Sequence, residues 1–161
     1  MEKVIMISLS IIKRKVKTLL LLERQDKLLI IEAFLLTGIF RIVVLIIPFK
    51  KYKKYIGIYN EETPLEINKK EYRIIKRIAW AVNSVSKITP WESKCLVQAL
   101  TAQRMLKRRK VISTIYFGLN KGTENNMQAH AWLRCGQIYV TGGHNKNGFK
   151  EVARFAIRKT D

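Results

Sequence analysis

Hydrophobic positions first occur in one long run near the N-terminus. Residues 19–49 are strongly apolar, but charged side chains interrupt the run, and Arg41 lies within its second half. A helix that spans a membrane needs about 20 mainly apolar residues, and an arginine at mid-membrane costs about 2.5 kcal/mol or more. We therefore expect a buried or interfacial helix rather than a span. Pro48 should end this helix, because proline cannot continue one.

The second half of the chain changes from helical to alternating spacing. Apolar positions repeat at helical intervals across residues 67–88, with lysine and arginine on the opposite face, which predicts an amphipathic helix. After residue 110 the alternation predicts strands at residues 111–119, 128–135, 137–141 and 151–157, with a hairpin turn at Gly136. Helices followed by an antiparallel sheet are typical of an α+β domain whose helix packs against one face of the sheet.

A further helical pattern surrounds Cys95, and its start is open. Thr89 could cap a helix in which Glu92 closes a capping box, or the cap could lie at Ser93. The Thr89 start places Cys95 in the second turn. The Ser93 start places it in the first turn, where the positive end of the helix dipole favours a thiolate.

A polar stretch ending in proline, residues 60–64, forms the best domain boundary. We expect a helical N-terminal segment at residues 1–62 and one main domain at residues 63–161. Just before the boundary, lysines and tyrosines cluster at Lys50, Lys51, Tyr52, Lys53, Lys54 and Tyr55. This cluster is either a solvated helix end or a patch that contacts a membrane surface or a protein partner.

Composition narrows the class of protein. The chain has 31 Lys and Arg against 12 Asp and Glu, a formal charge of +19 that attracts nucleic acid, acidic lipid or acidic peptide. Its 48% hydrophobic content excludes a disordered chain. Two cysteines without a Cys-x-x-Cys spacing indicate a reduced, cytoplasmic compartment. Residues 1–12 resemble a signal peptide only weakly, because Glu2 interrupts the basic region and no cleavage site follows, so we keep them in the mature protein.

Cys95 and His130 are the candidate catalytic pair. Cysteine catalysis needs a thiolate, a base and a group that orients the base, and these often come from distant parts of a chain. Cys95 lies at the start of a predicted helix, and His130 lies in a predicted strand between two alanines that leave room for a helix end. Cysteine, then histidine, then an acid or amide on the next strand is the order in papain-like and transglutaminase-like enzymes.

The flanking sequences resemble the leader peptidase of lasso-peptide biosynthesis, a stand-alone transglutaminase-like cysteine peptidase. The similarity covers most of the chain and rests on the motifs Thr89-Pro90-Trp91, Cys95-Leu96-Val97-Gln98-Ala99-Leu100, Phe117-Gly118, Ala129-His130-Ala131-Trp132-Leu133-Arg134-Cys135-Gly136 and Thr141-Gly142-Gly143. The resemblance implies removal of the leader from a ribosomal precursor peptide by thiol attack. It also implies two partners, a small leader-recognition protein and an ATP-dependent lasso cyclase, and no cofactor.

The family's third catalytic residue is an aspartate, and this sequence departs from that pattern. Position 142, twelve residues after His130, is a glycine. We expect Asn145 to orient the imidazole, with Thr141 as the alternative; a backbone carbonyl and the side chains of His144 and Glu151 also remain open. The backbone amide of Cys95 is expected to bind the oxyanion. Trp91 and Trp132 are expected to line the substrate groove or to pack structurally.

Three other functions remain open. A zinc site would use Cys95, His130, Cys135 and His144, but positions 130 and 135 face opposite sides of a continuous strand. A nucleic-acid module would explain the charge, but no recognition motif accompanies it. A transglutaminase-like acyltransferase would use the same pair and differ in what resolves the thioester. We therefore expect a cytoplasmic peptidase, with membrane association left open, that has no bound metal and no nucleic acid partner.

Overall fold

A computed structural model of the chain describes residues 22–122 and 126–158. The predictions made for residues 1–12 lie outside this part. The helical elements come first and are α2 (Arg24–Ile46), α3 (Phe49–Tyr52), the 3-10 turn η1 (Lys53–Tyr55), α4 (Lys69–Ser86) and α5 (Cys95–Arg108), with the strand β1 (Ile58–Tyr59) between η1 and α4. The remaining elements are β2 (Ser113–Lys121), β3 (Met127–Cys135), β4 (Ile138–Thr141), η2 (Gly143–Gly148) and β5 (Lys150–Ile157).

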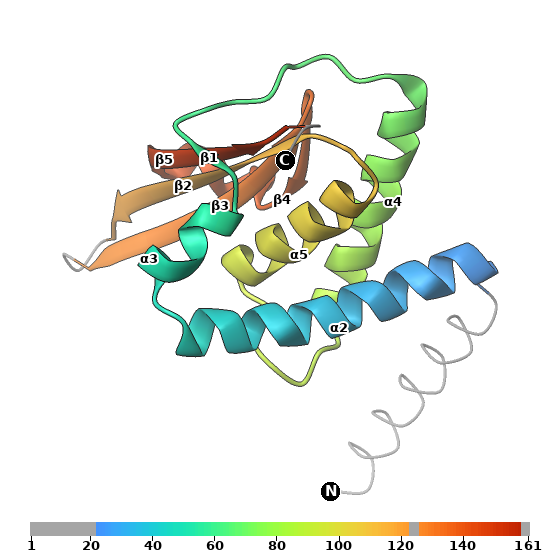
Figure 1. Ribbon diagram of the computed structural model, residues 1–161. Coiled ribbons are helices and arrows are strands. Elements are labelled where there is room, and N and C mark those ends of the chain that lie inside the picture. The colour runs from blue at the N-terminus through green and yellow to red at the C-terminus, as the bar shows by residue number, and fades with distance from the viewer. Residues whose placement is uncertain (1–21, 123–125, 159–161) are drawn as a thin grey trace, which may run out of the picture.

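The strands form one antiparallel sheet in the order β1-β5-β2-β3-β4. The four predicted strands are confirmed within two residues at each end, and so is the hairpin turn, where Gly136 adopts φ 55°. The strand β1 was not predicted, because two residues are too few to show alternation. Figure 1 shows α5 between the sheet and α2, with α4 beside both helices. The expected α+β fold, with the cysteine helix packed on an antiparallel sheet, is confirmed.

The core lies between the helices and one face of the sheet. Ala33 of α2, Ile78 of α4 and Met105 of α5 are fully buried together with Ile115 and Leu133 of the sheet. Full burial of each large aliphatic side chain contributes about 1.5–3 kcal/mol to the free energy of unfolding. These contacts fix α5, and with it Cys95, against the sheet.

The amphipathic helix predicted at residues 67–88 is α4. It begins with a capping box in which the side chain of Asn68 accepts from the backbone N–H of Glu71 and the carboxylate of Glu71 accepts from the N–H of Asn68. The buried positions repeat at intervals of three and four residues, at Ile75, Ile78, Ala81, Val82 and Val85. The sequence pattern therefore identified both the helix and its buried face.

The N-terminal helix α2 buries one side against α4 and α5, where Leu29, Ala33 and Thr37 are enclosed. It ends at Ile46, two residues before Pro48, as expected. Pro48 is the N-cap residue of the next helix, α3. Among the described residues, α2 is the one helix whose length and composition would let it cross a membrane. The structure uses its inner side for protein packing.

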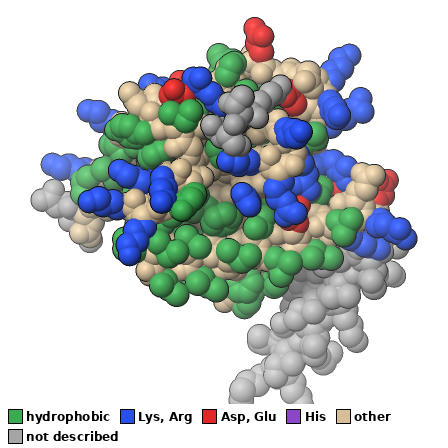
Figure 2. All heavy atoms as spheres, in the orientation of Figure 1, with side chains coloured by type: hydrophobic (Ala, Val, Ile, Leu, Met, Phe, Trp, Pro, Cys, Tyr) green, Lys and Arg blue, Asp and Glu red, His purple; other side chains and the backbone are tan. Residues whose placement is uncertain are grey.

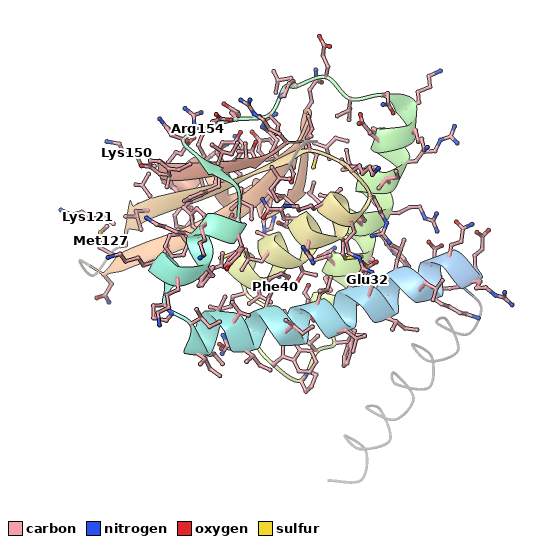
Figure 3. All side chains as sticks on the ribbon, in the orientation of Figure 1. Glu32, Phe40, Lys121, Met127, Lys150 and Arg154 are labelled. Carbon is pink, nitrogen blue, oxygen red and sulfur yellow. The ribbon has the colours of Figure 1, made fainter. Side chains whose placement is uncertain are left out.

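Ion pairs tie α2 to the other helices. Glu32 points from α2 toward α5 (Figure 3), where it pairs with Arg108 at 3.0 Å and Arg109 at 2.7 Å. Asp26 pairs with Arg77 of α4 at 2.6 Å. The domain boundary between residues 62 and 63 stays a prediction. The strand β1, which precedes this boundary, pairs with β5, which follows it.

Candidate active site

Cys95 is the first residue of α5, and no side chain caps this helix. Lys94 precedes it in extended conformation, with ψ 175°. The Thr89 start was wrong, because the Thr89 hydroxyl bonds the hydroxyl of Ser93 at 2.9 Å and the carbonyl oxygen of Trp91 at 3.0 Å within the preceding loop. The Ser93 start is off by one residue, but it placed Cys95 correctly in the first turn of α5. Cys95 lies in the first turn, among backbone N–H groups that have no carbonyl partner within the helix.

The N-terminal helix supports the loop that leads to Cys95. The ring of Trp91 lies 5.0 Å from that of Phe34, and it packs so closely on Gly38 that a Cβ there would lie 3.2 Å from the indole. Arg41 pairs with Glu92 at 3.0 Å. These contacts give Trp91 a packing role between α2 and the loop, and its expected role in the substrate groove stays a prediction.

His130 lies in β3 and is held by a backbone carbonyl. Its Nε2 atom is 2.8 Å from the carbonyl oxygen of Gly142. A carbonyl oxygen can only accept a hydrogen bond, so Nε2 carries the proton. The lone pair then resides on Nδ1, which leaves that atom free to act as a base.

A backbone carbonyl, and not the side chain of Asn145 or Thr141, bonds the imidazole of His130. Asn145 is exposed in η2, and the hydroxyl of Thr141 is buried without a hydrogen-bond partner among the described residues. Gly142 adopts φ 69°, a left-handed conformation that turns its carbonyl toward the imidazole. A Cβ at this position would lie 2.6 Å from the carbonyl oxygen of Ala131, so an aspartate does not fit this backbone.

Aromatic rings surround the imidazole. The ring of Phe149 lies 4.9 Å from that of His130, and Trp132 lies 5.9 Å away, nearly parallel. Trp132 in turn stacks on Tyr116 at 5.6 Å and is 6% exposed. Trp132 therefore packs behind the histidine and offers a bound peptide very little surface.

Cys95 and His130 come from elements that meet, but no hydrogen bond joins them among the residues that the structure describes. The side chains of Ala131 and Leu133 pack into the core with α5, and His130 projects from the other side of β3. A cavity of about 560 Å³ lies between α4, where Trp80 and Asn83 line it, Gln98 of α5 and residues 139–144; Cys95 and His130 are not among its lining residues. Gly142, which holds His130, lines this cavity.

The second cysteine has no part in this site. Cys135 is fully buried in the core, and burial raises the pKa of its thiol to about 12. It faces away from His130, as strand alternation predicted, which removes the geometry that the zinc alternative needs. In residues 22–122 and 126–158, no three His, Cys, Asp or Glu side chains are placed to hold a metal.

A polar network on the outer face of the sheet was not predicted. Arg134 is 4% exposed and donates to the hydroxyl of Tyr116, to the carboxylate of Glu62 and to the carbonyl oxygens of Thr63 and Gly136. Tyr116 also donates to Glu62. The network fastens the loop between β1 and α4 to the sheet. An arginine flanked by apolar residues in a strand was the available signal, because a buried guanidinium requires several acceptors.

The network also shifts ionisation. The hydrogen bond from Tyr116 lowers the pKa of Glu62, and the two arginines Arg134 and Arg154 act in the same direction. Burial, together with the hydrogen bond to Glu62, raises the pKa of Tyr116 to about 12. Glu62 therefore remains a carboxylate, and Tyr116 a neutral donor, across the neutral range.

A family model described as transglutaminase-like superfamily matches residues 50–154. This chain belongs to the transglutaminase-like superfamily. No curated protein and no solved structure matches it. The superfamily usually includes cysteine-based enzymes, so the coarse prediction of a cysteine-based, peptidase-like or acyltransferase-like role agrees with the family.

Proposed function

We propose that this transglutaminase-like protein is a cysteine peptidase that removes the leader from a lasso-peptide precursor. The observation that carries the proposal is the position of Cys95, half-buried at the uncapped start of α5 in a fold of this superfamily. The motifs around Cys95 and His130 resemble those of lasso-peptide leader peptidases, and this resemblance supports the choice of substrate. The expected partners are the small recognition protein that presents the leader and the cyclase that uses the freed core.

The proposed reaction begins with proton transfer from the Cys95 thiol to Nδ1 of His130. The thiolate attacks the carbonyl carbon of the last leader residue, and the backbone N–H of Cys95 donates to the oxyanion. The peptide C–N bond breaks as the imidazolium gives its proton to the leaving amine of the core. Water, deprotonated by His130, then hydrolyses the thioester, releasing the leader carboxylate and the thiol.

The carbonyl of Gly142 supports this sequence of steps by fixing one tautomer. Throughout the reaction Nε2 keeps its proton, so all proton transfer uses Nδ1. The thiol and imidazole must approach to about 3–3.5 Å before attack, and catalytic hydrogen bonds are often long without substrate. Because α5 packs on one face of β3 and His130 projects from the other, the proposal requires a rearrangement that brings the imidazole to Cys95 when the recognition protein delivers the leader.

Product masses test the proposal and separate it from acyl transfer. The purified chain, its recognition partner and the precursor are incubated together, and the peptides are weighed by mass spectrometry. Hydrolysis gives a free leader and a free core whose masses sum to that of the precursor plus one water. An acyltransferase would instead join the leader to an added amine, so the adduct would form and less free leader would be found. If the precursor survives intact with all partners present, the proposed substrate is wrong.

A further inference from the structure

The outer side of α2 carries a continuous hydrophobic stripe. The exposed positions repeat at intervals of three and four residues, opposite the buried side of the helix, and their side chains are 53–74% exposed: Leu28, Ile31, Leu35, Ile39, Ile42, Leu45 and Ile46. From Leu28 to Ile46 the stripe extends about 27 Å at the rise of an α-helix. Figure 2 shows hydrophobic side chains gathered along this lower face. An exposed patch of this extent marks an interaction surface.

Basic and aromatic side chains adjoin one end of the stripe. After α2 the chain presents Lys50, Lys51, Lys53 and Lys54, all exposed. Phe49 is 40% and Tyr55 72% exposed beside them. No aspartate or glutamate occurs between Glu32 and Glu61. An aliphatic face bordered by lysines and amphipathic aromatic rings has the composition of a helix that lies in the headgroup region of an anionic bilayer.

A cavity beside the same lysines adds a second observation. It has a volume of about 550 Å³ and apolar walls that include Phe40 and Val43 of α2 and Leu100 of α5. Five cations line it and no acidic side chain does among the described residues: Lys50, Lys51, Lys54, Arg104 and Lys107. Gln103, a residue 3% exposed, also lines the cavity, and its buried side-chain nitrogen has no hydrogen-bond partner among the described residues. Apolar walls bordered by cations fit an acyl chain with an anionic headgroup.

We propose that the outer stripe of α2 and the lysine cluster at residues 50–54 bind the surface of a membrane that contains anionic phospholipid. The stripe enters the interface lengthwise, and the lysines contact the headgroups. An acidic protein would match the charge, but the bilayer matches the charge, the length of aliphatic surface and the adjoining aromatic rings together. α2 then lies on the membrane and keeps its inner side packed on α4 and α5.

Vesicle flotation tests this proposal with the full chain. Vesicles of phosphatidylcholine alone are compared with vesicles that also contain phosphatidylglycerol, each at low and high salt. We expect flotation with the anionic vesicles and a decrease in salt. Ile42→Glu should reduce it strongly, because a charge would enter the hydrocarbon boundary. The matched control is Val152→Glu, at a residue 51% exposed on β5. Thermal melts confirm that both variants fold.

The lysines are tested by a matched pair of quadruple variants. Replacement of Lys50, Lys51, Lys53 and Lys54 with glutamine should weaken partition at least about tenfold. The control removes the same charge from Lys69, Lys70, Arg73 and Lys87. Equal loss in both quadruple variants, equal flotation with both vesicle types, or no flotation would overturn the proposal. One further result would overturn the proposal. If Ile42→Glu dissociated a dimer, or a complex with the recognition protein, and left flotation unchanged, the stripe would bind protein and not a membrane.

Discussion

The Nε2 atom of His130 lies 2.8 Å from the carbonyl oxygen of Gly142. Gly142 occupies the place where the resembling family has an aspartate, and its backbone carbonyl bonds the imidazole in this chain. A neutral carbonyl fixes the tautomer and supplies no full charge to stabilise an imidazolium. We expect a slower enzyme than one with an aspartate, and a histidine whose position depends on the backbone at residue 142.

Gly142→Ala should therefore damage the site. A Cβ at residue 142 would lie 2.6 Å from the carbonyl oxygen of Ala131 and 3.1 Å from Nε2 of His130. We expect a loss of about 1–2 kcal/mol in the free energy of unfolding from the left-handed conformation. Displacement of the base should lower the cleavage rate about 100-fold. Gly148→Ala is the control, because its Cβ would meet nothing within 4 Å. Equal activity of the two variants would contradict the assigned role of Gly142.

The two cysteines should differ in chemical reactivity. Burial raises the pKa of Cys135 to about 12, so at pH 8 only about one molecule in 10⁴ carries its thiolate. Cys95 is half-buried at the start of α5. Iodoacetamide at pH 8 should modify Cys95 in the folded protein and leave Cys135 intact, as measured by peptide mapping. Denaturant should make both react. Modification of Cys135 first would show that the core is more open than described.

Glu62→Gln should destabilise the protein in a pH-dependent way. The folded-state pKa of Glu62 lies below its ordinary value of 4.5, mainly because Tyr116 donates to it. The stabilisation is therefore complete above about pH 4.5 and is lost as the pH falls through the folded-state pKa. Because Glu62 is partly exposed, solvent screening limits the expected loss at pH 7 to about 1–2 kcal/mol.

Urea unfolding at pH 7 and pH 3 measures this difference. Glu66→Gln is the control, since Glu66 is an exposed residue of the same loop. The Glu62→Gln variant should differ from wild type at pH 7, and the difference should shrink as the pH falls. A deficit as large at pH 3 as at pH 7 would show that the Glu62→Gln substitution disturbs packing rather than charge.

Trp91 should act as a positioning residue. It joins the loop before Cys95 to Phe34 and Gly38 of α2. Trp91→Ala should lower Tm and reduce kcat more than it changes KM, because the loop sets the start of α5. Trp91→Phe keeps the ring contact and should recover most of the activity. If Trp91→Ala instead raised KM alone, Trp91 would be a wall of the leader groove.

The sequence was sufficient for the fold because local periodicity and long-range packing agree. Alternation identified the four longer strands, and helical spacing identified α4 with its buried face. The start of α5 was harder to predict, because the capping side chains at Thr89 and Ser93 bond each other instead of the helix. Their hydroxyl groups had two possible partners, and only tertiary structure shows which one they take.

The roles of Cys95 and His130 stay predictions, and the hydrogen-bond partner of His130 was not predictable from side chains. Asn145 was favoured because sequence reasoning compares side chains, whereas a carbonyl is present at every residue and carries no signal. The conformation of Gly142 decides which carbonyl faces His130. Trp132 was likewise ambiguous, since the aromatic stack with Tyr116 that buries it depends on strand register.

The most direct test of the catalytic account is leader release by Cys95→Ala, compared with wild type and Cys135→Ala. Each protein is supplied with the recognition partner and the precursor, and free leader is quantified by mass spectrometry. We expect Cys95→Ala to release no leader above the rate without enzyme, and Cys135→Ala, if folded, to retain cleavage. Undiminished cleavage by Cys95→Ala would contradict the account.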